Sequence, residues 1–202
     1  MKRMFWLVLT LALPVAALGN SVDFTDSGGT LSGTNAGLSL SSSTLIEVNG
    51  LNGKGLVTGN LGSVTLSTGL LSSGSLTMGG TFASGGSFVI TGNGTNGIPN
   101  TVIFNGSFSG PVTWSLINLS NGMHEYTLSG ALTGTWLTGA TVSGATIQLI
   151  VPVGSGFFNG SATISSGDTN ISITTVPEPG SLTLMGAGLV SVAGMLRRKL
   201  RT

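Results

Sequence analysis

The chain has 202 residues, with no Cys, one His, seven Lys and Arg, and six Asp and Glu. Without Cys there is no thiolate zinc site, no disulfide and no cysteine nucleophile. All the cations but one lie in the first three or the last six residues, so residues 20–176 hold one cation against five carboxylates, a net charge of −4. This excludes a nucleic-acid partner, because phosphate binding depends on clustered Lys and Arg.

Residues 1–19 are typical of a secretory signal helix. Lys2 and Arg3 precede an apolar run of 15 residues that is too short to span a membrane comfortably. Small residues then mark a cleavage site, with Ala17 and Gly19 at its −3 and −1 positions before Asn20. Cleavage after Ala17, a buried first strand and an uncleaved anchor are the alternatives. The expected partners are signal peptidase and the Sec-type export machinery.

Residues 20–175 are expected to be the exported domain, rich in Gly, Ser and Thr. Apolar residues alternate with polar ones at period 2, and the longest run is Ala145, Ile147, Leu149 and Val151. About ten to thirteen strands with one apolar face are expected. We predict an all-β fold, an antiparallel β-sandwich of jelly-roll type, with a β-solenoid as the alternative. The single Lys leaves strand edges without charge protection, so they are either covered by loops or pair with other chains.

Other apolar pairs at period 2 include Leu38/Leu40, Leu76/Met78 and Phe88/Ile90. Asn-Gly dipeptides favour type I′ hairpin turns, because Asn and Gly both tolerate positive φ. They occur at Asn49-Gly50, Asn52-Gly53, Asn93-Gly94, Asn96-Gly97 and Asn121-Gly122.

No residue pattern in this domain favours catalysis, and we predict a protein that is not an enzyme. His124-Glu125 is the only neighbouring base and carboxylate, but adjacent residues of a strand point to opposite faces. Gly-rich segments such as residues 92–97 lack the Lys-Ser/Thr ending of a phosphate-binding loop. We therefore expect no cofactor.

Two binding hypotheses remain for the exported domain. Asp23, Asp26 and Asp168 with Asn170 would form a calcium site if the first and last strands were neighbours, although Asp26 and Asp168 also fit turns. We favour turns and no metal. Trp114, Tyr126 and Trp136 would stack on sugars if exposed, which defines an alternative function as a carbohydrate-binding module. Their period-2 placement favours the core instead.

The C-terminal part, residues 176–202, has three elements in a fixed order. It begins with Val176-Pro177-Glu178-Pro179, where two prolines prevent sheet pairing. An apolar stretch from Leu182 to Leu196 follows and predicts a short transmembrane helix. Four cations then hold the end in the cytoplasm by the positive-inside rule; they are Arg197, Arg198, Lys199 and Arg201.

This order of Pro-Glu-Pro, apolar helix and Arg-rich tail resembles the PEP-CTERM sorting signal of bacterial exported proteins. The resemblance covers about residues 176–201. It implies recognition by an exosortase, a membrane transpeptidase-like enzyme, with transient anchoring in the inner membrane and removal of the anchor near Pro177-Glu178-Pro179. It also implies a Gram-negative bacterium that makes exopolysaccharide, a final place at the cell surface or outside the cell, and a structural role in a biofilm.

Overall fold

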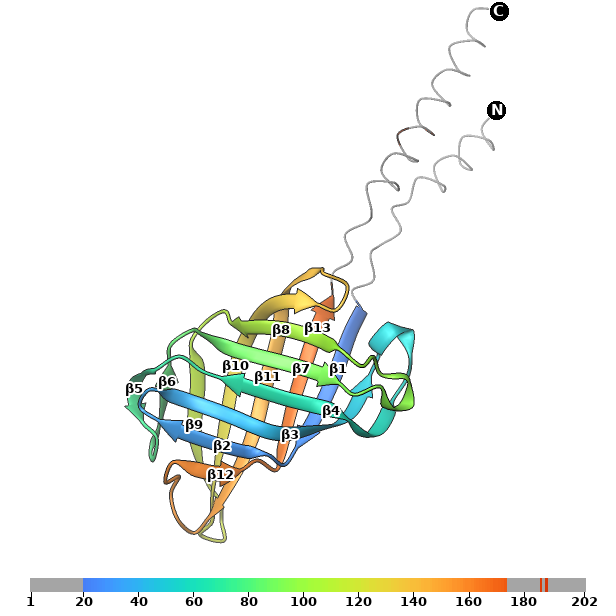
Figure 1. Ribbon diagram of the computed structural model, residues 1–202. Coiled ribbons are helices and arrows are strands. Elements are labelled where there is room, and N and C mark those ends of the chain that lie inside the picture. Colours follow the sequence, from blue (N-terminus) through green and yellow to red (C-terminus); the bar gives the residue numbers. More distant parts are fainter. Residues whose placement is uncertain (1–19, 174–185, 187, 189–202) are drawn as a thin grey trace, which may run out of the picture. The chain divides into compact units, whose positions relative to one another are not determined.

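The alternating pattern forms thirteen β-strands and two short 3₁₀ turns in the part of the chain that the computed structural model describes, residues 20–173 with 186 and 188 (Figure 1). The first six strands are β1 (Asn20–Ser27), β2 (Thr30–Thr34), β3 (Gly37–Asn49), β4 (Val57–Ser67), β5 (Leu71–Ser75) and β6 (Gly79–Phe82). The other seven are β7 (Gly85–Gly92), β8 (Val102–Phe108), β9 (Val112–Asn118), β10 (His124–Trp136), β11 (Thr141–Gly154), β12 (Ser161–Thr163) and β13 (Ser166–Ile173). The 3₁₀ turns are η1 (Leu51–Gly53) and η2 (Thr95–Gly97).

Eight strands close into one barrel, in the order β1, β3, β4, β7, β8, β10, β11, β13 and back to β1. Closure occurs because β10 pairs with β11 as well as with β8, and β13 pairs with both β11 and β1. The all-β prediction is confirmed, but the predicted two-sheet sandwich is wrong. A solenoid is equally wrong, because antiparallel strands close into one ring through the pairing of the last strand, β13, with the first, β1. Strands with one apolar and one polar face occur in β-sandwiches and in β-barrels alike. Only the identity of the paired strands distinguishes a barrel from a sandwich.

β-Bulges curve the sheet so that it can close. The pairing register shifts between Thr25 and Asp26 in β1 and between Leu132 and Gly134 in β10. At Gly62 in β4 the backbone has φ +151°, and an added Cβ would lie 1.9 Å from the carbonyl oxygen of Thr91. Glycine therefore allows β4 and β7 to approach closely at this position.

The inward faces of the strands form one apolar core. Trp114 and Tyr126 stack with their ring centroids 4.7 Å apart, and Phe158 packs edge-on against Trp114. The polar atoms of these rings are satisfied, because Trp114 Nε1 donates to the carbonyl oxygen of Leu76 and Tyr126 Oη donates to that of Thr77. Trp136 is also buried. The expected core placement of the three aromatic residues is confirmed.

The ring removes most strand edges, which explains how the domain manages with one Lys. Strands β9, β6 and β5 extend the sheet from β10, and β2 and β12 form a second short extension from β3. The outermost strand, β5, is short and irregular, with a register shift between Leu71 and Ser73 and φ +79° at Gly74. Irregularity of this kind protects an edge without charge.

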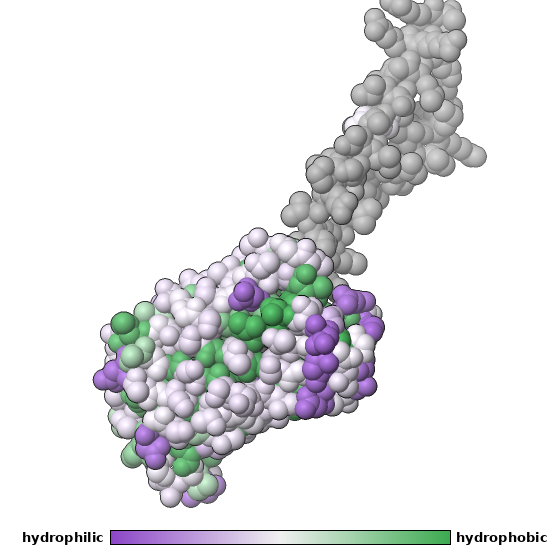
Figure 2. Space-filling view, in the orientation of Figure 1, coloured by the Kyte–Doolittle hydropathy of each residue, from purple (hydrophilic) through white to green (hydrophobic). Residues whose placement is uncertain are grey.

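Two loops at one end of the barrel repeat the sequence Asn-Gly-x-Asn-Gly, at residues 49–53 and 93–97. In each loop the second Asn and the Gly after it both have positive φ, as type I′ turns require. Asn49, Asn93 and Asn121 do not, so the type I′ prediction is wrong at those three positions. Lys54 Nζ donates to the carbonyl oxygen of Gly97 at 3.2 Å and joins the loops. Figure 2 shows the hydrophilic side chains of this end beside β4.

The predicted pair Leu76/Met78 does not form a strand, since both residues lie in the turn between β5 and β6. Residues Ser21–Ile173 form one compact unit. The predicted signal helix at residues 1–19 and the predicted transmembrane helix at Leu182–Leu196 lie outside the described residues, apart from Gly186 and Gly188. Within the described part of the chain, no helix has the length and apolar character needed to cross a membrane.

Candidate functional site

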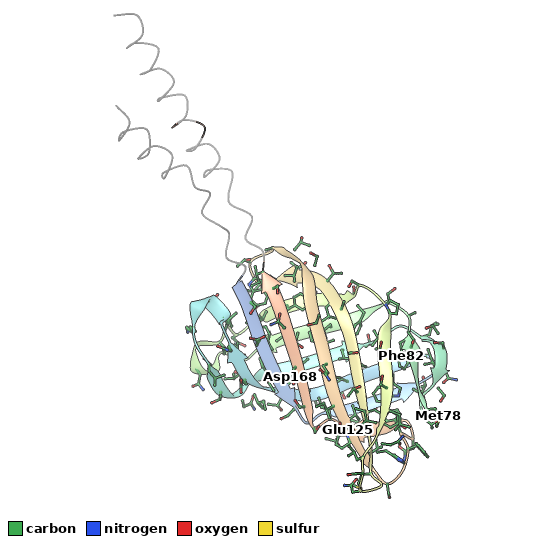
Figure 3. All side chains as sticks on the ribbon, turned by 180° about the vertical axis from the view of Figure 1, so that it is seen from behind. Met78, Phe82, Glu125 and Asp168 are labelled. Carbon is green, nitrogen blue, oxygen red and sulfur yellow. The ribbon has the colours of Figure 1, made fainter. Side chains whose placement is uncertain are left out.

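A shallow open groove of about 690 Å³ crosses the outer surface of β1, β13, β11, β10 and β9. Its position follows from strand register. Asp168 lies opposite Gln148, Gln148 opposite Ser129, and Ser129 opposite Thr113. These four side chains are exposed and form a polar row across four neighbouring strands. Figure 3 shows Asp168 on this sheet from behind.

A second polar row runs beside the first. Asn170 lies opposite Thr146 on β11, and its side-chain Nδ2 donates to Asp23 Oδ1 on β1. In the first row, Thr25 Oγ1 donates to Asp168 Oδ1 at 3.0 Å, and Ser166 Oγ donates to the other carboxylate oxygen at 3.3 Å. Hydrogen bonds between strands thus hold both carboxylates of the groove in place.

The first and last strands are neighbours, as the calcium hypothesis required, but its carboxylates do not converge. Asp23 and Asp168 face outward, whereas Asp26 points into the core with 1% of its surface exposed. Among residues 20–173, 186 and 188, no three acidic or His side chains are grouped to hold a metal ion. The turn assignments of Asp26 and Asp168 are also wrong, because both residues lie within strands.

Asp26 is a carboxyl group in an apolar interior. Burial raises its pKa to about 6, against the lowering effect of a hydrogen bond from Ser43, and the Asp168 carboxylate raises it further. Asp26 Oδ1 has no hydrogen-bond partner and abuts Gly167, where an added Cβ would lie 2.5 Å from it. No sequence signal marks this residue as buried, apart from its parity with Val22 and Phe24.

His124 is the first residue of β10 and is not among the residues that line the groove. Its ring stacks on that of Phe157, with centroids 4.5 Å apart and an angle of 14° between the planes. The nitrogen Nδ1 lies 3.0 Å from the carbonyl oxygen of Gly156, and it must donate, because a carbonyl oxygen only accepts. The loop between β11 and β12 thereby orients the ring, and in the described part of the chain no hydrogen bond or ion pair joins it to the Glu125 carboxylate.

The aromatic residues that the carbohydrate-binding hypothesis would stack on a sugar are not exposed at the surface. Trp114, Tyr126 and Trp136 are at most 5% exposed, so the version of the carbohydrate-binding hypothesis that uses them is wrong. No sequence motif marks the groove residues Thr113, Ser129, Thr146 and Gln148. Each of these residues is a polar residue between apolar strand positions, and this was the only sequence signal for an exposed strand face. Their proximity could not be predicted, because it depends on the pairing of strands that are distant in the sequence.

Residues 175–199 match the PEP-CTERM protein-sorting motif, as the resemblance predicted. The chain therefore carries a PEP-CTERM sorting signal, which marks an exported protein that is handled by an exosortase. The predicted motif residues Val176–Pro179, the basic residues Arg197, Arg198, Lys199 and Arg201, and the cleavage residues Ala17 and Gly19 lie outside the described residues. Asn20, the residue after the predicted cleavage, begins β1. No curated protein and no solved structure matches the chain.

Proposed function

We propose, from the PEP-CTERM sorting motif that this chain carries, that it is a structural protein of the bacterial cell surface or extracellular matrix, without catalytic activity. The signal peptide directs the chain through the inner membrane, and the C-terminal apolar segment then holds it there. An exosortase acts near Pro177-Glu178-Pro179 and releases the barrel to its final place. The match at residues 175–199 is the single observation that carries this proposal.

The chemistry of the barrel is consistent with a structural role. Its sole His, at the start of β10, is stacked and hydrogen-bonded against the loop between β11 and β12, and its large aromatic residues fill the core. Ring closure leaves few unpaired strand edges, which suits a stable protein outside the cell. Association with an exopolysaccharide matrix and a role in a biofilm belong to the same proposal.

Mass spectrometry of the mature protein from its own bacterium tests the processing step. We expect the surface-located protein to end near Pro179 and to lack Arg201. The double variant Pro177→Ala/Pro179→Ala should keep the full C-terminus and remain in the inner membrane. The matched variant Pro152→Ala, which changes an exposed proline of β11, should be processed normally. A surface-located pool that still carries Arg201 contradicts the proposal.

The absence of catalysis is tested separately with His124→Ala. We expect the surface and biofilm properties of the cells to be unchanged, because the proposed role needs no proton transfer. Loss of these properties in a variant that folds and reaches the surface normally would show that His124 acts chemically.

A further inference from the structure

We propose that the groove on β1, β13, β11, β10 and β9 binds a hydroxyl-rich glycan chain that bears no negative charge. The proposal goes beyond the delivery of the protein, because it assigns a ligand class to a surface of the barrel. It depends on the polar rows of the groove and not on the buried aromatic residues.

The shape of the groove suits an extended chain. It crosses five adjacent strands, and a strand spacing of about 4.8 Å gives a length of about 19 Å across them. The groove is open and shallow, whereas pockets for small molecules usually enclose most of the ligand. A linear polymer can lie across the strands with further units extending beyond the groove.

The lining groups match the hydrogen-bonding capacity of sugar hydroxyls. A hydroxyl both donates and accepts, so it pairs with a carboxylate, an amide or another hydroxyl. The groove presents all three kinds, with carboxylates at Asp23 and Asp168, amides at Gln148 and Asn170, and hydroxyls such as that of Ser129. Carboxylates form the stronger, charge-assisted hydrogen bonds of this set.

The carboxylates are held before a ligand arrives. Asn170 fixes Asp23, and Thr25 and Ser166 fix Asp168. Each carboxylate oxygen still has capacity for a further donor. Preorganised groups lose less conformational entropy on binding, so weak individual contacts can add up to a measurable affinity.

Charge decides between ligand classes. The groove has two carboxylates and no Lys, Arg or His among its lining residues, so it repels uronic acids, sulfated sugars and phosphates. Apolar ligands gain little, because the large apolar residues at the groove, Phe24 and Ile147, have at most 3% of their surface exposed. A neutral or amino-sugar chain remains, and the ammonium group of an amino sugar complements Asp23 and Asp168.

Binding of the full chain, purified in detergent, to immobilised oligosaccharides tests the proposal. The probes are a neutral glucan, an amino-sugar oligomer and a uronic-acid oligomer. We expect binding to the neutral or the amino-sugar probe and none to the uronic-acid probe. Gln148→Ala should weaken binding about tenfold, the effect of losing one hydrogen bond of about 1.4 kcal/mol.

A pair of matched variants separates a specific site from a sticky surface. Ser129→Tyr places a bulky ring in the groove and should abolish binding, whereas Ser39→Tyr changes an exposed serine of β3 outside it and should not. Circular dichroism confirms that both variants fold. Binding to no neutral or amino-sugar probe, equal binding by the two variants, or equal binding of the uronic-acid probe overturns the proposal. Detergent-purified chain needs no sorting, so failure here leaves the proposed delivery and processing of the protein unaffected.

Discussion

Asp26 on β1 and Ser43 on β3 form a hydrogen-bonded pair inside the barrel, where both side chains are almost inaccessible to water. Ser43 Oγ also lies 3.3 Å from the carbonyl oxygen of Ser27. With Asp26 protonated, its proton can be donated to Ser43 Oγ while Ser43 donates to Ser27, which satisfies each donor. Ionised, Asp26 retains a charge in an apolar core, and this arrangement makes the barrel sensitive to pH.

The barrel should lose stability as the pH rises from about 4 to about 6. The pKa of Asp26 is about 6 in the folded protein, whereas the ordinary value of 3.8 applies to the unfolded chain. Between these two pH values the folded state therefore binds more protons than the unfolded state, and its stability falls as the pH rises. The full effect is on the order of 3 kcal/mol, reached above pH 6. Urea unfolding of the wild type at a series of pH values measures it.

Asp26→Asn should remove this pH dependence and be more stable than the wild type at pH 7. The matched variant Glu47→Gln, which changes an outward-facing carboxyl of β3, should retain it. A wild-type stability that is flat or rises between pH 4 and pH 6 would contradict the assignment of Asp26 as a buried acid.

Gly62→Ala should destabilise the barrel by about 3 kcal/mol or more, because its Cβ would collide with the Thr91 carbonyl and φ at this position is +151°. Gly55→Ala is the matched control. An added Cβ at Gly55 has no neighbour within 4 Å, so we expect a change within about 0.5 kcal/mol. Thermal and urea unfolding compare the two variants, and similar stabilities would show that β4 and β7 pair differently.

A circular permutant should fold into the same barrel. The bonds Asp23–Asn170 and Thr25–Asp168 show that β1 and β13 run in opposite directions, so the start of β1 lies beside the end of β13 (Figure 1), and this register places Ser21 beside Ser172. A short linker can join these residues, with new termini opened after the exposed Gly122. Circular dichroism and unfolding curves should resemble those of the parent. A permutant opened within β10, after Leu128, should not fold.

Local pattern was sufficient to predict the all-β class and several buried strand faces, but not the barrel. The run Ala145–Val151 lies in β11, and the parity of Trp114 and Tyr126 indicated the core. In contrast, Leu76 and Met78 show the same spacing but lie in a turn, because the strand ends at Ser75. Alternation of apolar and polar residues within a segment therefore indicates which face is buried, but it does not determine the residue at which a strand ends.

Closure and the groove could not be predicted in this way, because both depend on contacts between distant residues. Asp168 meets Thr25 across 143 positions, and no local signal specifies that pairing. The burial of Asp26 depends on the same seam between β1 and β13. The sorting signal was predictable for the opposite reason, since its parts are consecutive and each part has its own composition.

The seam between the first and last strands sets an order of events during secretion. A chain that passes through the membrane from its N-terminus delivers β1 early, but β1 must wait for its neighbour β13 until Ile173 has crossed. Under the proposed export, the barrel can therefore close only when the residues directly before the sorting motif at 175–199 have crossed the membrane.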